Sequence, residues 1–447
     1  MSSAQLDRAP APAADLLVRG ARLFDPRTGL DGEADLLVRG GEIAEIGDGL
    51  ERPDGCEVVE AAGLCALPAF VDPHVHLRTP GREDEEDIES GTRAAAAGGF
   101  GAILAMPNTD PVVDSASIVR SLRQRAREQA RVPVGFMAAI TVGQKGEGLT
   151  EMADLADAGA PGFTDDGLPV VSAGVLRQAL RYQRLSGGVI ALHEEDPALS
   201  AGGVMHEGPV SALLGMSGIP SISESTMIAR DAAIARYEGG RIHVQHLSAR
   251  ESVAAVEQAK AEGVQITAEA SPHHLCLTDE EVRRTLDTGY KMNPPLRSED
   301  DRQALIDGLR SGIVDCVATD HAPHSREEKE QPFETAPMGV TGLETAFAAL
   351  HTELVLAGVL PLRLVVERMT AGGEPFGIPA PRLERGAAAN LCLVDLSAAW
   401  QVGDAGYESR SANCAFDGRT LTGRVRMTVA GGAVAYRERS FAIQGVA

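Results

Sequence analysis

The sequence has few lysines, no closely spaced cysteine pair and no long apolar run, and each absence excludes a class of protein. Among 447 residues, lysine occurs only at Lys145, Lys260, Lys291 and Lys329, so little lysine-dependent chemistry is available. The longest weakly polar stretch, 132–143, is too short to span a bilayer. Residues 1–15 lack the apolar core of an export signal. We therefore expect no membrane partner.

The cysteines and the net charge exclude further kinds of site and partner. The six cysteines include no C-x-x-C pair, which favours a reduced, cytoplasmic compartment and excludes a cysteine metal site. Acidic residues number 64 against 41 basic ones, giving a net charge of −23, and this argues against nucleic acid as a partner. With 44% apolar and 23% charged residues, the chain is globular.

The pattern of short apolar runs predicts two domains and an arm. Residues 1–14, rich in Ala and Pro, predict a disordered arm. Short strands separated by Gly and Asp in 15–65 and again in 376–447 predict one small β-sandwich domain, since neither end has enough strands alone. Residues 66–375 alternate apolar strands with segments of helical periodicity. Eight such units predict an α/β fold, a parallel (β/α)₈ TIM-like barrel.

Unusual polar residues follow the predicted barrel strands at the point where each ends. Ten of the eleven histidines lie within 73–324, and seven of them are at strand ends. Because the carboxyl ends of barrel strands share one face, these side chains should meet at one mouth. They are His74, His76, Asn108, Asp165, Asp166, His193, His246, His273, His274, Asp320 and His324.

The spacing of the histidines predicts a metal centre. His74 and His76 are two residues apart on a strand, so both imidazoles point to one face. His193 and His246 end two later strands, and Asp320 follows the last one. Four imidazoles with carboxylates suit zinc, and their number exceeds one open four-coordinate site. We therefore expect two Zn²⁺ ions per chain, inferred from the donor set.

Two cations need a bridging anion between them. In many enzymes of this architecture a carbamylated lysine bridges, but no lysine here ends a strand in the right place. The sequence offers Asp165 and Asp166 instead, in FTDDG. We choose Asp166 as the bridge, and the opposite assignment stays open. His243 is interpreted as a packed histidine, because it lies on the opposite strand face from His246.

Eight motifs in order give a resemblance to a known family. They are FVDPHVHLR, MPNTDP, GFTDDG, LHEED, HVQHLS, PHHL, KMNPPLR and ATDHAPH, and they resemble the class I dihydroorotases of the amidohydrolase superfamily. The resemblance covers about residues 15–435. It implies a zinc-dependent cyclic amidohydrolase that reversibly cyclises N-carbamoyl-L-aspartate to L-dihydroorotate in pyrimidine biosynthesis. A hydroxide activated by two metal ions would be the nucleophile, with Asp320 as metal ligand and acid/base.

The resemblance also implies residues that bind the small-molecule substrate. Arg78 lies on the strand face of His76, and its planar guanidinium group suits a carboxylate. The expected substrate-binding set is His76, Arg78, Asn108, Asn293, His324, Met338 and Gly339.

Two further features are expected to be structural. His273 and His274 should orient neighbouring side chains, and the acidic run 82–90 predicts a solvated loop leading into a helix.

Two alternatives remain open. A hydantoinase or allantoinase would share the barrel, both metals and Asp320, but it would normally carry the bridging lysine. A non-catalytic dihydroorotase-like scaffold for aspartate transcarbamoylase should have lost metal ligands, whereas all six candidates are present here. We expect a homodimer, and association with aspartate transcarbamoylase is compatible with an active enzyme.

Overall fold

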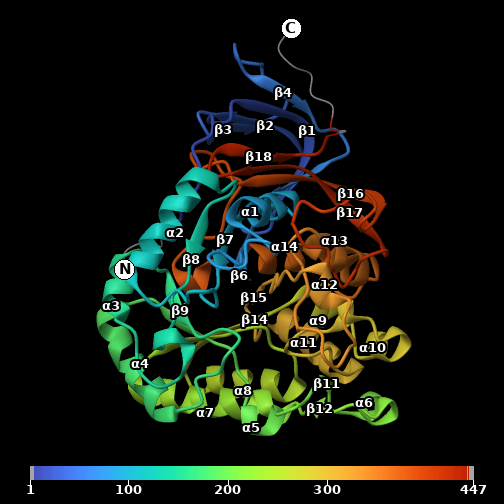
Figure 1. Ribbon diagram of the computed structural model, residues 1–447. Coiled ribbons are helices and arrows are strands. Elements are labelled where there is room, and N and C mark those ends of the chain that lie inside the picture. The colour runs from blue at the N-terminus through green and yellow to red at the C-terminus, as the bar shows by residue number, and fades with distance from the viewer. Residues whose placement is uncertain (1–4, 440, 442–447) are drawn as a thin grey trace.

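Strands from both ends of the chain form one eight-stranded sheet, which lies above the rest of the molecule in Figure 1. The computed structural model describes residues 5–439 and 441. The sheet order is β18-β17-β16-β5-β1-β2-β3, and β4 pairs with β1. The strands are β1 (Leu16–Asp25), β2 (Leu30–Arg39), β3 (Glu42–Gly47), β4 (Glu57–Glu60), β5 (Cys65–Pro68), β16 (Leu391–Gln401), β17 (Thr420–Ala430) and β18 (Ala433–Arg437). The prediction of a small β-domain built from both termini is confirmed.

The middle of the chain forms the barrel, with its strands in chain order. Hydrogen bonding joins β6-β7-β8 and β9-β10-β13-β14-β15 as parallel neighbours. Isolated bridges from Ala138 to Phe163 and from Val75 to His321 connect these two groups, so the prediction of an eight-stranded barrel is confirmed. The strands are β6 (Phe70–Val75), β7 (Phe100–Ala105), β8 (Val134–Phe136), β9 (Gly162–Thr164), β10 (Val189–Leu192), β13 (Arg241–Val244), β14 (Gln265–Ala270) and β15 (Cys316–Val317).

One helix packs outside the barrel after each strand, and shorter elements lie in the loops (Figure 1). The outer helices are α1 (Ile88–Ala97), α2 (Ala116–Gln129), α3 (Met152–Asp157), α4 (Ala173–Ser186), α7 (Ile222–Glu238), α8 (Arg250–Ala261), α11 (Glu299–Ser311) and α14 (Leu362–Thr370). The loop elements are α5 (Pro197–Ser200), β11 (Met205–His206), α6 (Pro209–Leu214), β12 (Gly218–Ile219), α9 (Pro272–Cys276), α10 (Glu280–Thr285), α12 (Arg326–Lys329), α13 (Ala346–Leu350), the π-helix His351–Leu356 and the 3₁₀ turns Val142–Gln144, Thr288–Tyr290 and Glu374–Phe376.

A continuous apolar core fixes the barrel to its helices. The ring of Phe70 on β6 lies 5.7 Å from that of Phe100 on β7 and 5.4 Å from that of Phe347 on α13. All three rings are buried, and truncating such a side chain typically costs about 3–5 kcal/mol of stability. Because β6 carries His74 and leads into His76, this packing anchors the start of the site.

The predicted disordered arm is wrong for residues 5–14, while residues 1–4 lie outside the described part. Backbone bonds join Asp7 and Val134 in both directions, at 3.0 and 2.9 Å. The Asp7 carboxylate also pairs with Arg123 at 2.6 Å and Arg127 at 2.8 Å. Ion pairs and single backbone bridges leave no periodic apolar signal, so the sequence did not reveal this attachment.

The predicted acidic loop is partly wrong. Helix α1 does begin there, at Ile88, with Asp87 and Ser90 forming a capping box. Glu85 and Glu86, however, are fully buried and paired with basic and hydroxyl groups. From sequence alone, an acidic run is interpreted as solvent-exposed, because the basic and hydroxyl groups that pair with it come from distant segments of the chain.

The bounds of β5 and β6 can be compared with one predicted domain boundary, the one between residues 65 and 66. The predicted boundary between residues 65 and 66 falls inside β5, which belongs to the terminal sheet, and the first barrel strand begins at Phe70. The remaining limits stay a prediction. Among the described residues, no helix has the length and apolar character needed to cross a membrane.

Candidate active site

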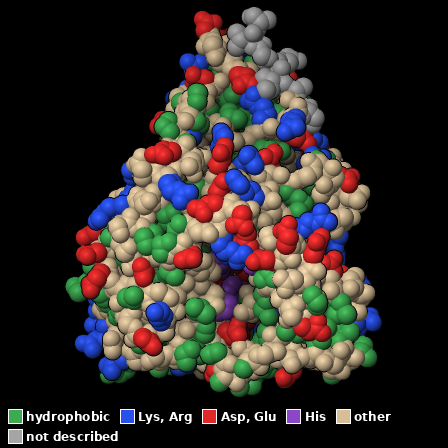
Figure 2. All heavy atoms as spheres, in the orientation of Figure 1, with side chains coloured by type: hydrophobic (Ala, Val, Ile, Leu, Met, Phe, Trp, Pro, Cys, Tyr) green, Lys and Arg blue, Asp and Glu red, His purple; other side chains and the backbone are tan. Residues whose placement is uncertain are grey.

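The predicted metal ligands meet where the barrel strands end. His74 is on β6 and His76 follows it, while the other four residues come within three residues of the ends of β9, β10, β13 and β15. Figure 2 shows histidine atoms inside a hollow of the molecular surface, with acidic and basic side chains around it. The six residues are His74, His76, Asp166, His193, His246 and Asp320, and all are buried.

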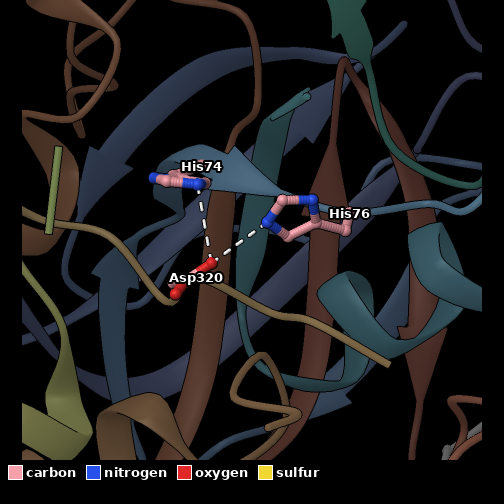
Figure 3. Close-up of side chains that lie close together, drawn as sticks. All are labelled: His74, His76 and Asp320. Atoms are coloured by element: carbon pink, nitrogen blue, oxygen red, sulfur yellow. Dashed lines mark hydrogen bonds and ion pairs between the residues drawn. The ribbon is translucent and has the colours of Figure 1, made fainter. Parts of the chain in front are cut away.

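Asp320 contacts both histidines of the H-x-H pair (Figure 3). Its Oδ1 lies 3.1 Å from His76 Nε2 and 3.5 Å from His74 Nε2. The residues are 244 and 246 positions apart in the chain, so only the barrel brings them together. These three groups could hold one metal ion.

Asp166 lies among all four predicted histidine ligands. Its Oδ1 is 3.3 Å from His74 Nε2, 3.7 Å from His246 Nε2 and 3.8 Å from His193 Nδ1. Its Oδ2 is 3.5 Å from His76 Nε2. A carboxylate in this central place can face two ions at once, and His74, Asp166 and His246 form a second candidate ligand group.

The neighbouring Asp165 points away from this cluster. Its Oδ1 accepts hydrogen bonds from the backbone N–H groups of Ile140 and Thr141, at 2.8 and 3.1 Å. The Thr141 hydroxyl donates to its other oxygen. Burial raises the pKa of Asp165 to about 6 although these bonds oppose the shift. Asp165 therefore fixes the loop after β8, and the geometry favours Asp166 as the bridge.

Hydrogen bonds on the far side of two imidazoles leave their inner nitrogens available. His74 Nδ1 donates to Glu269 at 2.7 Å, and His76 Nδ1 donates to Asn108 Oδ1 at 2.9 Å. The Nδ1 atoms thereby carry protons, and with a cation between the imidazoles and the carboxylates of Asp166 and Asp320 the Nε2 lone pairs would be free to ligate it. His74 Nε2 is a buried polar atom without a hydrogen-bond partner among the described residues. These donors fit divalent cations.

The charges of the buried histidines and aspartates also fit divalent cations. Burial alone would raise the pKa values of Asp166 and Asp320, but the neighbouring histidines outweigh it and hold both below their usual range. Burial alone would lower the pKa of His74, yet Asp166, Glu269 and Asp320 raise it well above its usual value. The buried carboxylates thus favour positive charge at their centre, which divalent cations would supply.

Backbone strain concentrates at this site. Five non-glycine residues in 5–439 have a positive φ, and three of them belong to the candidate site. They are Arg78 at 53°, His246 at 31° and Asp320 at 48°. Left-handed backbone at residues with a Cβ costs free energy and persists where the surrounding structure enforces it. The strands therefore end in bent segments that aim these side chains inward.

Several predicted substrate-binding groups gather on one side of the cluster. Arg78 Nη2 lies 3.4 Å from His324 Nε2, and Arg78 Nε donates to the Pro323 carbonyl at 3.0 Å. His324 Nε2 donates to the Met338 carbonyl at 2.9 Å. Gly339, at φ 139°, packs so tightly that a Cβ there would approach His324 Nε2 to 2.8 Å. The imidazole of His324 thus links Arg78 to the backbone at 338–339.

The two predicted asparagines lie beside different candidate ligands, Asn108 beside His76 and Asn293 beside His193. Asn108 joins His76 to Asp166, with its Nδ2 3.5 Å from Asp166 Oδ2. Asn293 Nδ2 donates to Glu195 at 2.7 Å and lies 3.5 Å from His193 Nε2. Its Oδ1 is buried and has no hydrogen-bond partner in the described part of the chain, so it could accept from a ligand.

His273, His274 and the four lysines lie outside the candidate ligand groups found among the described residues. His274 bridges Ser271 and the Pro294 carbonyl, at 2.7 and 2.9 Å, while His273 Nε2 has no hydrogen-bond partner within 5–439. Lys145 is exposed, Lys260 pairs with Asp315, and the other two lysines donate to backbone carbonyls. None of the four lysines is placed to bridge metals.

The sequence did not identify Glu269 as part of the site. Its carboxylate accepts from His74 Nδ1 on one oxygen and from His243 Nε2, at 3.0 Å, on the other. His243, interpreted from sequence as merely packed, also bonds to Thr267 at 2.8 Å. Burial opposes ionisation, but the two histidines lower the pKa of Glu269 to about 2. The one feature of the sequence that could have indicated Glu269 is its position as a single acid inside the apolar strand 265–270.

Comparison with known proteins identifies the family. A family described as dihydro-orotase-like matches residues 63–252. The chain is 45% identical to a dihydroorotase of Pelotomaculum thermopropionicum over 425 residues, covering 95% of this chain and 99% of the relative. A dihydroorotase of Anaeromyxobacter dehalogenans is 44% identical, covering 95% and 98%. The chain belongs to the dihydroorotase family.

Solved structures place this dihydroorotase-family chain among the cyclic amidohydrolases. An L-hydantoinase (dihydropyrimidinase) from Arthrobacter aurescens matches with a TM-score of 0.85 at 27% identity, covering 97% of this chain and 98% of the other. A D-hydantoinase (dihydropyrimidinase) from Thermus sp. matches with 0.81 at 26%, covering 96% and 97%. The barrel with a terminal β-domain is therefore common to them, and the predicted fold and family are confirmed.

Changing Glu269 to Gln should weaken metal binding by about 10- to 100-fold, because Gln can accept a bond from His74 or His243 but not from both. Competition against a chelator gives the affinity. Glu262→Gln is the matched control, since Glu262 is exposed and pairs only with Arg236 among the ion pairs found. Equal affinities of the two variants would show that Glu269 does not orient His74.

Proposed function

We propose that the protein is a dihydroorotase that interconverts N-carbamoyl-L-aspartate and L-dihydroorotate in pyrimidine biosynthesis, in the cytoplasm. The observation that carries the proposal is the buried cluster of four histidines and two aspartates beside Arg78, in a chain of this family. A metal centre alone would suit many hydrolases. An arginine next to it adds a subsite for a substrate carboxylate.

We further propose two divalent ions, with zinc as the first choice. His74, His76 and Asp320 would hold one ion and His193 and His246 the other, with Asp166 between them. When bound, the ions would lower the proton affinity of water and polarise the ring carbonyl.

Asp320 is the proposed acid/base. Its carboxylate lies at the mouth beside His76 and can accept the proton of the attacking water. As the new C–O bond forms and the ring C–N bond breaks, Asp320 returns that proton to the departing ring nitrogen. The reverse sequence closes the ring, so one group serves both directions.

Arg78 and its neighbours are the proposed carboxylate subsite. Arg78 supplies the charge, while Asn108, Asn293, His324 and the backbone at 338–339 would orient the rest of the substrate. His76 would contact both metal and substrate. This set fits dihydroorotate better than hydantoin or allantoin, which lack the carboxylate.

The deciding experiment compares substrates on zinc-loaded protein. We expect turnover of dihydroorotate and carbamoyl aspartate with about two ions per chain. Comparable turnover of hydantoin or allantoin without dihydroorotate activity would remove the assignment and favour the hydantoinase alternative. Absence of all activity with intact metal would favour the scaffold alternative. One ion per chain at full activity would refute the paired centre.

Arg78→Ala should raise KM for dihydroorotate by about 10- to 150-fold, the loss of about 1.5–3 kcal/mol from a charged hydrogen bond. Initial rates over a range of substrate concentrations give KM. Arg326→Ala is the control, because Arg326 is exposed on α12 and pairs with Glu330. An unchanged KM would count against the carboxylate subsite.

A homodimer, and assembly with aspartate transcarbamoylase, are also proposed on the family resemblance. Light scattering of the purified protein, alone and mixed with the transcarbamoylase of the same organism, distinguishes them. A monomer at all concentrations would contradict the first, and unchanged masses on mixing the second.

A further inference from the structure

Behind the proposed carboxylate subsite lies a fully buried acid, Glu85, in the loop between β6 and α1. Its Oε2 lies 3.4 Å from Arg78 Nε, and its Oε1 lies 3.4 Å from His324 Nδ1. The same Oε1 accepts from the backbone N–H of Ser325 at 3.3 Å. One carboxylate therefore joins the loop after the first barrel strand to the loop after the last.

Other contacts hold Glu85 itself in place. Arg82 Nη2 pairs with Glu85 Oε1 at 2.8 Å, and the Ser411 hydroxyl donates to the Glu85 carbonyl at 2.8 Å. Arg82 also pairs with Glu328, whose Oε2 lies 3.1 Å from His324 Nδ1. Arg82 thus fixes the carboxylate from its own loop, Glu328 of α12 holds Arg82 and His324, and Ser411 fixes the Glu85 backbone.

The charges favour a fixed hydrogen-bonded assembly over a further cation site. Glu85, His324 and Glu328 could hold a metal by distance alone. However, Arg78 and Arg82 already place two guanidinium charges against these two carboxylates. A cation there would face both guanidinium groups at close range. The acids instead neutralise and orient the arginines.

We propose that Glu85 is a positioning residue for substrate binding: its buried carboxylate holds Arg78 and His324 in the orientation in which both meet the substrate carboxylate. The inference rests on the proposed function. Arg78 Nε donates its single hydrogen to the Pro323 carbonyl, so Glu85 Oε2, at 3.4 Å from the same atom, acts on Arg78 as a buried negative charge and not through a hydrogen bond. Arg78 Nη2 thereby lies toward His324, 3.4 Å from its Nε2. Preorganisation of this kind lowers the cost of ordering a long side chain on binding.

Glu85→Gln tests the proposal by separating KM from kcat. Gln fills the same space but cannot pair with both basic groups as an anion. We expect KM for dihydroorotate to rise about five- to tenfold, because the buried negative charge beside Arg78 and His324 is lost, with kcat within about twofold. Glu83→Gln is the matched control on the same loop, because Glu83 is partly exposed and pairs with Arg125.

A double-mutant cycle with Arg78→Ala adds a readout that a purely structural role would not move. If Glu85 acts through Arg78, then Glu85→Gln should change KM much less in the Arg78→Ala background than in the wild type. Additive effects would overturn the proposal, as would a parallel fall in kcat or an unchanged KM. Wild-type protein without dihydroorotate activity would instead refute the proposed function.

Should Glu85→Gln fail to fold, Glu328→Gln tests the same assembly from its exposed side. Glu328 contacts His324 Nδ1 and is partly solvent-accessible, so its loss is easier to tolerate. We expect a smaller rise of KM, about twofold to fivefold, with kcat retained. An unchanged KM in this folded variant would overturn the proposal.

Discussion

Asp320→Asn should lower kcat for dihydroorotate by about 10²- to 10⁴-fold, the usual contribution of a positioned acid/base, while the protein keeps its fold. The side chain contacts His74 and His76, and the amide has the same shape. Asparagine cannot accept and return a proton at neutral pH. Steady-state rates in both directions measure the effect, since one group is proposed to serve both.

The metal content of the variant and a control substitution decide whether the loss reflects acid/base chemistry or metal binding. Asp320 is also a candidate ligand, so metal content must be determined in the same sample. Ions retained with kcat lost would support the acid/base role, whereas ions lost would reduce Asp320 to a ligand. Asp307→Asn on α11 is the control, because Asp307 is exposed and pairs with Arg310. Full activity of Asp320→Asn would contradict both roles.

Much of this site could be predicted from the sequence because local geometry determines it. Residues two apart on a strand share a face, which aligned His74 with His76 and separated His243 from His246. The barrel then brings strand ends together whatever their separation in the chain. These two rules placed all six ligand candidates in one cluster.

Partner choice among charged groups could not be predicted in the same way. The run at 82–90 looked solvated, yet Glu85 is buried against Arg78 and His324, and Glu86 against His321. Glu269 reaches His74 across 195 positions. Such pairs leave no periodic pattern, because each depends on where two unrelated segments pass in space. The attachment of Asp7 to Arg123 escaped detection for the same reason.

The adjacent aspartates of FTDDG illustrate this limit. Sequence alone left open which one faces the metals, since both follow β9 within two residues. In the structure Asp166 contacts four histidines, while Asp165 accepts from the loop after β8. The two neighbouring side chains thus meet different partners, backbone N–H groups for Asp165 and imidazoles for Asp166. Their different surroundings make them a natural matched pair for mutation.

Asp166→Asn should therefore lower metal affinity by more than the 10- to 100-fold effect of an outer partner such as Glu269, and activity should fall with metal content, by about 100-fold or more. Asparagine removes the negative charge that faces four imidazoles. Asp165→Asn should keep its metal, because Asn can still accept from the Ile140 N–H, and burial already raises the pKa of Asp165 to about 6. Metal analysis and chelator competition on both variants measure the difference. Stronger metal loss in Asp165→Asn than in Asp166→Asn would reverse the assignment of the bridge.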